Sequence, residues 1–170
     1  CAKLNSSHKP NEKKINEIIL DEKKIDANSY KRLSKRIDNT KNTITNFLKW
    51  VGKKNVIGYG ASTKGNIVLN QCNLNSKDIQ FICDANPYKY NRYTPGSNIK
   101  IISKEKMRKL RPKYLFVLIW SFRKEVIIQE TDYIKKGGKL VFHLPIFHIV
   151  DKKNYKDYLK DDFNTFSFNY

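Results

Sequence analysis

The sequence predicts an α/β protein with a Rossmann-like, mostly parallel sheet of five strands, flanked by helices and preceded by a helical extension. Two observations carry this prediction. From residue 55 onward, short apolar runs alternate with segments of helical periodicity, which is the pattern of a parallel sheet with crossover helices. In addition, the glycine-rich stretch VIGYGASTKGN, residues 56–66, lies between the first apolar run and the first of these helices.

The segment before the first strand is expected to be polar and partly helical. Residues 1–28 are rich in lysine, and we expect a linker or arm there with at most a short helix near residues 15–20. From Tyr30 to Val51, apolar residues recur at spacings of three, four and seven, so a long helix with one apolar face is predicted. Ser29 is its expected N-cap.

The alternating units follow in order. Strands are expected at residues 55–57, 79–84, 98–102, 114–120 and 139–144. Helices are expected at residues 64–72, at residues 104–110 after a Ser103 cap, and at residues 122–136 before the stop signal Gly137-Gly138. The predicted organisation is therefore an arm at 1–28, a Rossmann-like domain at 29–150 and a tail at 151–170. Within the domain, the helices are expected to connect the parallel strands by right-handed crossovers.

Composition limits the classes of partner. The formal net charge is +18, but the lysines are scattered over every segment, so a basic nucleic-acid-binding module remains only an alternative. No apolar stretch approaches the ~20 residues of a membrane span, and we expect a soluble, cytoplasmic protein with no membrane partner. Because the chain starts at Cys1 rather than methionine, we interpret it as part of a longer polypeptide.

Cysteine and histidine are too sparse for a metal centre. The three cysteines form no C-x-x-C pair and the three histidines are widely separated, so neither a disulfide framework nor a zinc site is predicted.

The glycine-rich turn is the first candidate binding element. Such a turn directs backbone N–H groups and a helix N-terminus at one point, which favours an anion. Its spacing, G-x-G-x-x-x-x-G, matches neither the dinucleotide pattern nor the phosphate loop. The candidate residues of this turn are Gly58, Gly60, Ala61, Ser62, Lys64, Gly65 and Asn66.

Further candidates follow other strands, where ligands of an open parallel sheet bind. Asp84 closes the second strand and is either a ribose-binding acid or an Asx-turn residue before Asn86. The long loop 86–98 carries Arg92 and Tyr93, which suit a phosphate and a base or sugar. Trp120 and Ser121 end the fourth strand as a possible pocket wall. No set of side chains predicts catalysis by this chain alone.

Four stretches carry a resemblance to a known family. In order and spacing, YGASTKGNIVLNQC, DANPYKYNRYTPGSNIKI, LIWSFRKEVIIQE and GGKLVFHLP resemble the C-terminal domain of the sugar C-methyltransferase family. The resemblance covers about residues 30–150 and depends most on two unusual motifs, G-A-x-x-K-G-N and R-Y-T-P-G. By motif, the second of these assigns Arg92, Tyr93, Thr94, Pro95 and Gly96 to a ligand loop.

The resemblance implies an enzyme of three parts. A small zinc-binding segment and a middle domain, which binds S-adenosylmethionine and carries the catalytic base, precede a C-terminal domain that helps to bind a nucleotide-linked deoxysugar. The first two parts are not recognisable in this sequence. The resemblance therefore implies that S-adenosylmethionine is bound mainly by a domain absent from this chain. The expected partner is that preceding domain or another sugar-modifying unit.

Three hypotheses follow from the sequence. The leading one is the nucleotide-sugar-binding C-terminal domain of an S-adenosylmethionine-dependent sugar methyltransferase in deoxysugar and glycan biosynthesis, catalytically incomplete alone. The second is a self-contained Rossmann-fold methyltransferase or dinucleotide-binding enzyme that uses GYGASTKG for its cofactor, with binding abolished by Gly60→Val. The third is the basic nucleic-acid-binding module.

Overall fold

The architecture was obtained from a computed structural model, which describes residues 7–160; residues 1–6 and 161–170 lie outside the described part. Contacts divide the chain into a first unit that ends at Asn39 and a second that begins at Thr40. The predicted domain boundaries themselves stay a prediction. None of the described helices is both long and apolar enough to cross a membrane.

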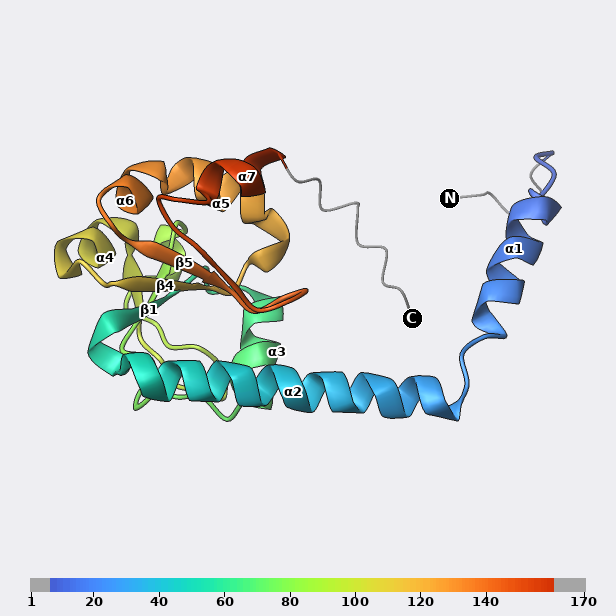
Figure 1. Cartoon of the computed structure of the whole chain (residues 1–170), viewed down its shortest axis with the longest axis horizontal. Coiled ribbons are helices and arrows are strands. Elements are labelled where there is room, and N and C mark those ends of the chain that lie inside the picture. Colours follow the sequence, from blue (N-terminus) through green and yellow to red (C-terminus); the bar gives the residue numbers. More distant parts are fainter. Residues whose placement is uncertain (1–6, 161–170) are drawn as a thin grey trace. The chain divides into compact units, whose positions relative to one another are not determined.

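Six strands form one sheet in the order β3-β2-β1-β4-β5-β6. Its middle strands β1, β4 and β5 are labelled in Figure 1. The strands are Val56–Tyr59 (β1), Ile82–Asp84 (β2), Ile101–Ser103 (β3), Tyr114–Val117 (β4), Lys139–Phe142 (β5) and His148–Val150 (β6). Neighbours from β3 to β5 pair in parallel, and β6 runs antiparallel to β5. The strand order reverses between β1 and β4, as in the Rossmann fold, so the predicted fold class is confirmed.

The helices alternate with these strands. The α-helices are Glu12–Glu22 (α1), Ala27–Val51 (α2), Thr63–Gln71 (α3), Lys104–Leu110 (α4), Arg123–Gln129 (α5), Thr131–Lys135 (α6) and Tyr155–Lys160 (α7). Short 3₁₀ turns occur at Lys53–Asn55 (η1), Pro87–Lys89 (η2) and Trp120–Phe122 (η3).

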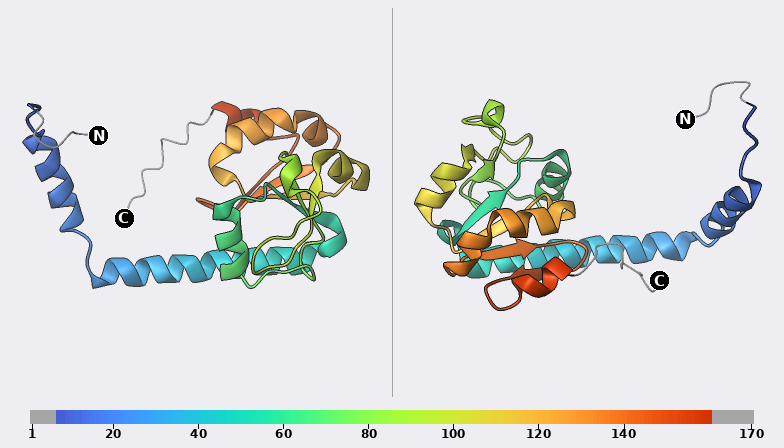
Figure 2. Two further views of the ribbon diagram at one scale, coloured as in Figure 1. Left: turned by 180° about the vertical axis from the view of Figure 1, so that it is seen from behind. Right: turned by 90° about the horizontal axis from the view of Figure 1, so that it is seen from above.

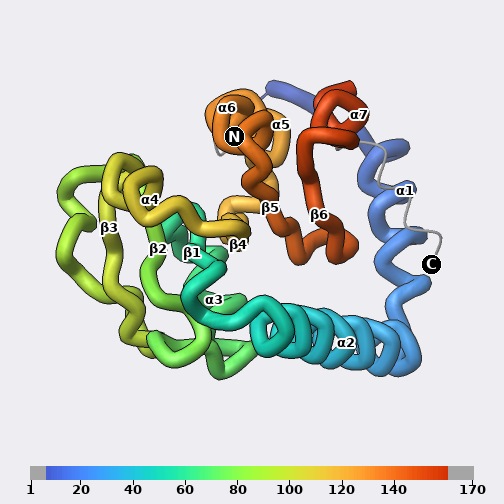
Figure 3. The backbone as a smooth tube through the Cα atoms, turned by 60° about the vertical axis from the view of Figure 1, so that its left-hand side comes forward, coloured from blue at the N-terminus to red at the C-terminus, as the bar shows by residue number. Residues whose placement is uncertain are grey.

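Two apolar layers cover the two faces of the sheet. Side chains of β4 alternate between them: Phe116 joins the layer under α2 and α3, whereas Leu115 joins the layer under α4, α5 and α6. Figure 3 shows α3 on one side of the strands and α4 to α6 on the other. Within α2, burial is confined to its last two turns, where Ile44, Leu48 and Val51 face the sheet.

The described residues of the first unit form no buried core of their own. None of the described residues up to Asn39 is buried, although α1 exposes Ile18 and Leu20, and α2 exposes Tyr30 and Leu33. The helical structure of this unit therefore depends on local interactions such as helix caps. Asn11 caps α1 through its side-chain oxygen, which accepts the Lys14 N–H at 3.0 Å.

The predicted cap of the long helix was wrong by three residues. The helix begins at Ala27, and the Asp26 carboxylate accepts the Ser29 backbone N–H at 2.7 Å. The Ser29 hydroxyl in turn accepts the Asp26 N–H at 3.3 Å. Asp26 is thus the N-cap, and Ser29 is the third residue of the helix, which completes a reciprocal pair of hydrogen bonds with it. The periodicity of the apolar residues alone does not distinguish these two positions.

The helix predicted at residues 122–136 is divided into η3, α5 and α6. The break falls at Glu130, whose side chain is only 1% exposed and enters a buried polar network. Its carboxylate accepts the Tyr59 hydroxyl at 2.9 Å and two bonds from the Arg108 guanidinium at 3.0 and 3.2 Å. The pKa of Tyr59 is held well above its ordinary value, first because the side chain is buried and second because the Glu130 carboxylate lies beside its hydroxyl group.

The predicted stop after this helical segment is confirmed. Gly137 has φ +97°, and its N–H donates to the Ile134 carbonyl oxygen at 3.0 Å. The next amide, of Gly138, donates to the Tyr133 carbonyl oxygen at 3.0 Å, which completes a Schellman motif.

Two substitutions test where α2 joins the core. Ile44 is completely buried, so Ile44→Ala is expected to lower the free energy of unfolding by about 2–5 kcal/mol through lost burial and a residual cavity. Leu33 lies on the same helix with 51% of its surface exposed, and Leu33→Ala is expected to change stability by less than about 0.5 kcal/mol. Urea denaturation of both variants measures this difference, and equal losses would contradict it.

Candidate functional site

The candidate residues lie at the carboxyl ends of β1, β2 and β4 and in the segments that follow these strands; Gly58 is inside β1, Asp84 is the last residue of β2, and Lys64, Gly65 and Asn66 are in the first turn of α3. Because parallel strands end at the same edge of a sheet, these three loops share its carboxyl edge, where ligands of open α/β sheets bind. β1 and β4 are neighbours at the reversal of strand order.

The glycine turn packs tightly against the chain that leaves β4. Gly60 has φ +89°, and a Cβ atom there would lie 2.6 Å from the side chain of Ile119. A Cβ atom at Gly65 would lie 2.8 Å from Cβ of Leu118. The Ser62 hydroxyl caps α3 by accepting the Gly65 N–H at 3.0 Å. These contacts hold the N-terminus of α3 beside the reversal point, which is the place between β1 and β4 where the strand order reverses.

The close packing at Gly60 limits what the substitution Gly60→Val can test. Gly60→Val would insert a branched side chain into the space that Ile119 fills, at a backbone conformation that disfavours valine. Loss of ligand binding in that variant would follow from the displaced turn with any ligand. Gly60→Val therefore does not separate a cofactor site from a substrate site.

Lys64 and Trp120 meet across the reversal point. The Lys64 ammonium nitrogen lies 5.9 Å from the centroid of the Trp120 ring, within the range of a cation–π contact. Lys64 is exposed on the first turn of α3, and Trp120 opens η3 beside the exposed Ser121. The pair presents a positive charge and a flat ring at one place.

Asp84 joins the glycine turn to the β2 loop. Its Oδ2 accepts the Ala61 N–H at 2.7 Å and the Lys89 ammonium at 3.2 Å, and its Oδ1 accepts the Asn86 N–H at 2.8 Å. The Asx turn considered from the sequence is thus present. The role of Asp84 toward a ribose stays a prediction.

The loop between β2 and β3 is held by its own buried hydroxyl groups. Thr94 and Ser97 are 3% and 2% exposed, and their oxygens lie 2.6 Å apart. The Thr94 hydroxyl also accepts the Ile99 N–H at 2.9 Å. Arg92 and Tyr93 stand just before this buried turn with exposed side chains. The backbone that carries them is therefore ordered while their polar groups face outward.

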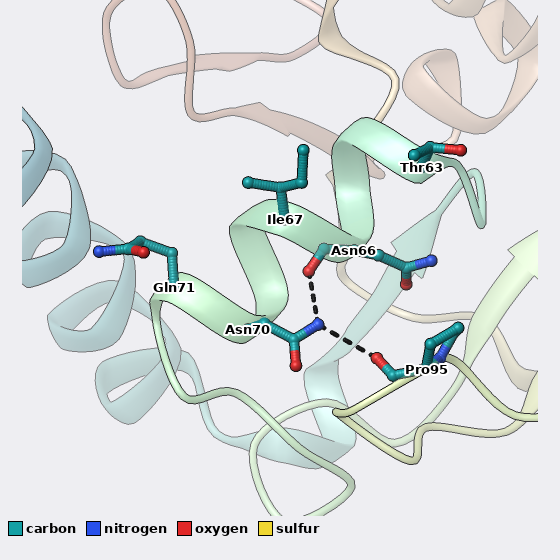
Figure 4. A pocket seen from close by; sticks show the side chains of 6 residues that line it. All are labelled: Thr63, Asn66, Ile67, Asn70, Gln71 and Pro95. Atoms are coloured by element: carbon teal, nitrogen blue, oxygen red, sulfur yellow. Dashed lines mark hydrogen bonds between the residues drawn. The ribbon is translucent and has the colours of Figure 1, made fainter.

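An open pocket lies between α3 and this loop (Figure 4). Its lining consists of Thr63, Asn66, Ile67, Asn70, Gln71 and Pro95. The Asn70 amide nitrogen donates to the Asn66 carbonyl oxygen at 2.7 Å and to the Pro95 carbonyl oxygen at 3.1 Å. Figure 2 shows the loop, in yellow-green, beside α3.

Sequence reasoning missed two residues of this site. Asn70 and Lys89 connect the candidate loops, and Lys89 also donates to the Ala61 carbonyl oxygen at 2.9 Å. Their partners are 25 and 28 residues away in the sequence, so no local pattern marks either residue. The structure brings Ala61 to Asp84 and Lys64 to Trp120, whereas Arg92 lies on a separately held loop.

His143 follows β5 at the same edge but is buried. Its ring is tilted by 46° against that of Phe116 with centroids 5.3 Å apart, and the residue is only 1% exposed. Burial lowers the pKa of His143 to about 4, so the ring is neutral at physiological pH. Among residues 7–160, no group of three or more potential ligands could hold a metal ion.

Comparison with known proteins identifies the family. The model of the C-methyltransferase C-terminal domain family matches residues 1–145. The chain belongs to this family. The C-methyltransferase NovU of Streptomyces niveus is 36% identical over 92 residues, which are 54% of this chain and 22% of NovU. The chain thus spans about a fifth of that relative's length. The resemblance inferred from the sequence is confirmed.

The loops described above lie within the residues that the family model matches. They belong to a domain of methyltransferases, a class of enzyme that in general uses S-adenosylmethionine. The family match includes the first unit and strands β1 to β5, and it ends before β6.

The buried histidine predicts a pH dependence of stability. The pKa of His143 is about 4 in the fold against about 6.5 in the unfolded chain. Between these values the unfolded state binds more protons, so the free energy of unfolding falls as the pH is lowered from 6.5 to 4, by at most about 3 kcal/mol. His143→Leu removes this contribution. Urea denaturation at several pH values should show a shallower acid loss in the variant, and parallel curves would refute the assignment.

Proposed function

We propose that this domain binds the nucleotide-linked deoxysugar of an S-adenosylmethionine-dependent sugar C-methyltransferase that serves glycan biosynthesis. The observation that carries the proposal is the pairing of Lys64 with Trp120 at the reversal of strand order. A nucleoside diphosphate sugar combines an anionic diphosphate with planar and apolar parts. A helix N-terminus with an adjacent lysine suits the diphosphate, and an aromatic ring suits a base or sugar face.

The second loop supplies the complementary groups. The Arg92 guanidinium can bind phosphate oxygens through two parallel hydrogen bonds, and the Tyr93 ring can stack on a flat group. Both side chains are exposed on an ordered backbone, so little conformational entropy of the loop is lost on binding. In this proposal the glycine turn, with Ser62 and Asn66, shapes the anion-binding end of the site.

Methyl transfer itself is assigned to a different part of the enzyme. S-Adenosylmethionine, which supplies the activated methyl group, would be bound mainly by a domain outside this chain. Two observations support that assignment. In dinucleotide-binding Rossmann folds the cofactor passes close to the glycine turn. Here the side chain of Ile119 fills the space beside Gly60. The Asp84 carboxylate, which would bind a cofactor ribose, already accepts three hydrogen bonds.

The same proposal defines the partners and the compartment. The chain would work with a preceding domain of the same polypeptide or with another sugar-modifying unit, and a cytoplasmic location would give both access to nucleotide sugars. We propose no membrane or nucleic-acid partner, because the basic residues are distributed over the whole sequence.

Calorimetric titration tests this assignment directly. The full chain is titrated with a panel of nucleoside diphosphate deoxysugars and, separately, with S-adenosylmethionine. Saturable binding of a nucleotide sugar without binding of S-adenosylmethionine supports the proposal. Binding of S-adenosylmethionine alone would instead support a self-contained Rossmann methyltransferase, and steeply salt-dependent binding of DNA or RNA would support the nucleic-acid module.

Two charge deletions test the proposed contacts. Lys64→Ala and Arg92→Ala are each expected to weaken nucleotide-sugar binding by about 10- to 100-fold, because each removes a charge-assisted contact to the diphosphate. Lys54→Ala is the matched control, since Lys54 is exposed in η1 before β1, at the opposite edge of the sheet. Unchanged affinity in both site variants, with thermal unfolding as in the parent, would remove these residues from the site.

A further inference from the structure

The R-Y-T-P-G loop is joined to α3 by one side chain. Asn70 lies on the last turns of α3, and its amide nitrogen donates to the Pro95 carbonyl oxygen at 3.1 Å. A second bond from the same nitrogen, to the Asn66 carbonyl oxygen at 2.7 Å, orients the amide along the helix (Figure 4). The donor therefore points at the loop before any ligand is present.

The loop is shaped to receive this amide. Gly96 has φ +75°, and a Cβ atom there would lie 2.0 Å from the Asn70 side-chain oxygen. No residue larger than glycine fits without displacing either the loop or the amide. The two contacts make Asn70 and the Pro95-Gly96 segment complementary in shape as well as in hydrogen bonding.

The backbone of the loop is fixed on both sides of Arg92. On the C-terminal side, Thr94 pairs with Ile99 through both its N–H, at 3.0 Å, and its hydroxyl, at 2.9 Å. Across the loop, the Arg92 carbonyl oxygen accepts the Ile101 N–H at 2.8 Å. These bonds make the loop rigid within itself. Among the described residues, the hydrogen bond from Asn70 to Pro95 links this rigid loop to α3.

We propose that Asn70 is a positioning residue, which locks the R-Y-T-P-G loop against α3 so that Arg92 is held at a fixed place relative to Lys64. This inference rests on the proposed function, because it assigns both cations to one ligand. In this role Asn70 acts through the loop and not through a ligand contact of its own. It acts by keeping the two halves of the site in register, so that binding does not have to order them.

The test combines Asn70→Ala with Arg92→Ala. Alanine removes the amide without adding charge and favours the helix, so the fold should persist. Asn70→Ala is expected to weaken nucleotide-sugar binding by about fivefold to tenfold through loss of preorganisation. In the Arg92→Ala background the same change should cost less than about twofold, because the residue it positions is gone. Asn42→Ala, at an exposed position of α2, is the matched control.

Gly96→Ala perturbs the same contact from the other side. It is expected to weaken binding as Asn70→Ala does, and to cost less when Asn70 is already alanine, since the clashing amide has been removed. Hydrogen exchange of the amides of residues 91–99 should accelerate in both single variants, whether or not a ligand binds.

The outcomes separate the two proposals. If the parent chain binds no nucleotide sugar, the proposed function fails, and hydrogen exchange alone reports on the role of Asn70 in ordering the loop. If the parent binds but Asn70→Ala binds equally well, or if its effect is undiminished in the Arg92→Ala background, the positioning role is overturned.

Discussion

Close packing between the glycine turn and the residues that leave β4 determines where the candidate site lies. Two positions without a Cβ atom, Gly60 and Gly65, allow α3 to start within contact of Ile119 and Leu118. Larger residues there would push the helix away from the reversal of strand order. The exposed Lys64 would then lose its place beside the ring that follows β4. The glycines thus serve the protein's own packing, and the exposed residues of the candidate site lie just beyond them.

The loops at the carboxyl edge are held by side chains that belong to other elements. The Asp84 carboxylate ties the β2 loop to the glycine turn, and Asn70 ties the Pro95 segment to α3. In the proposed binding role, such contacts would lower the entropy that is lost on binding, because the polar groups are arranged in advance. They also hold in place a loop that has little regular secondary structure beyond η2. The site is therefore a property of the assembled sheet and not of one motif.

Sequence patterns were sufficient to predict the fold class and to identify the loops that carry the exposed candidate residues. Alternating apolar runs located five parallel strands, and the motifs around Lys64 and Arg92 located the loops. The strand β6 was missed because three residues after Pro145 carry too little pattern to distinguish a strand from a tail. The break at Glu130 was missed because the partners of its buried side chain are remote in the sequence, and the hydrogen bond from Tyr59 spans 71 residues. Contacts of that range leave no local trace in a single sequence, and Asn70 was overlooked for the same reason.

The antiparallel pairing of β6 also has a consequence for association between chains. Residues of β5 are almost entirely buried, and without a neighbour their outer hydrogen-bonding groups would form an open sheet edge. β6 pairs with three of them, and His148 stacks on Phe142 with ring centroids 5.1 Å apart. The ring of Tyr158 in α7 lies 4.8 Å from that of His148 on its other side. The residues after the parallel sheet thus cover its β5 edge, which would otherwise be open to pairing with a strand of another chain.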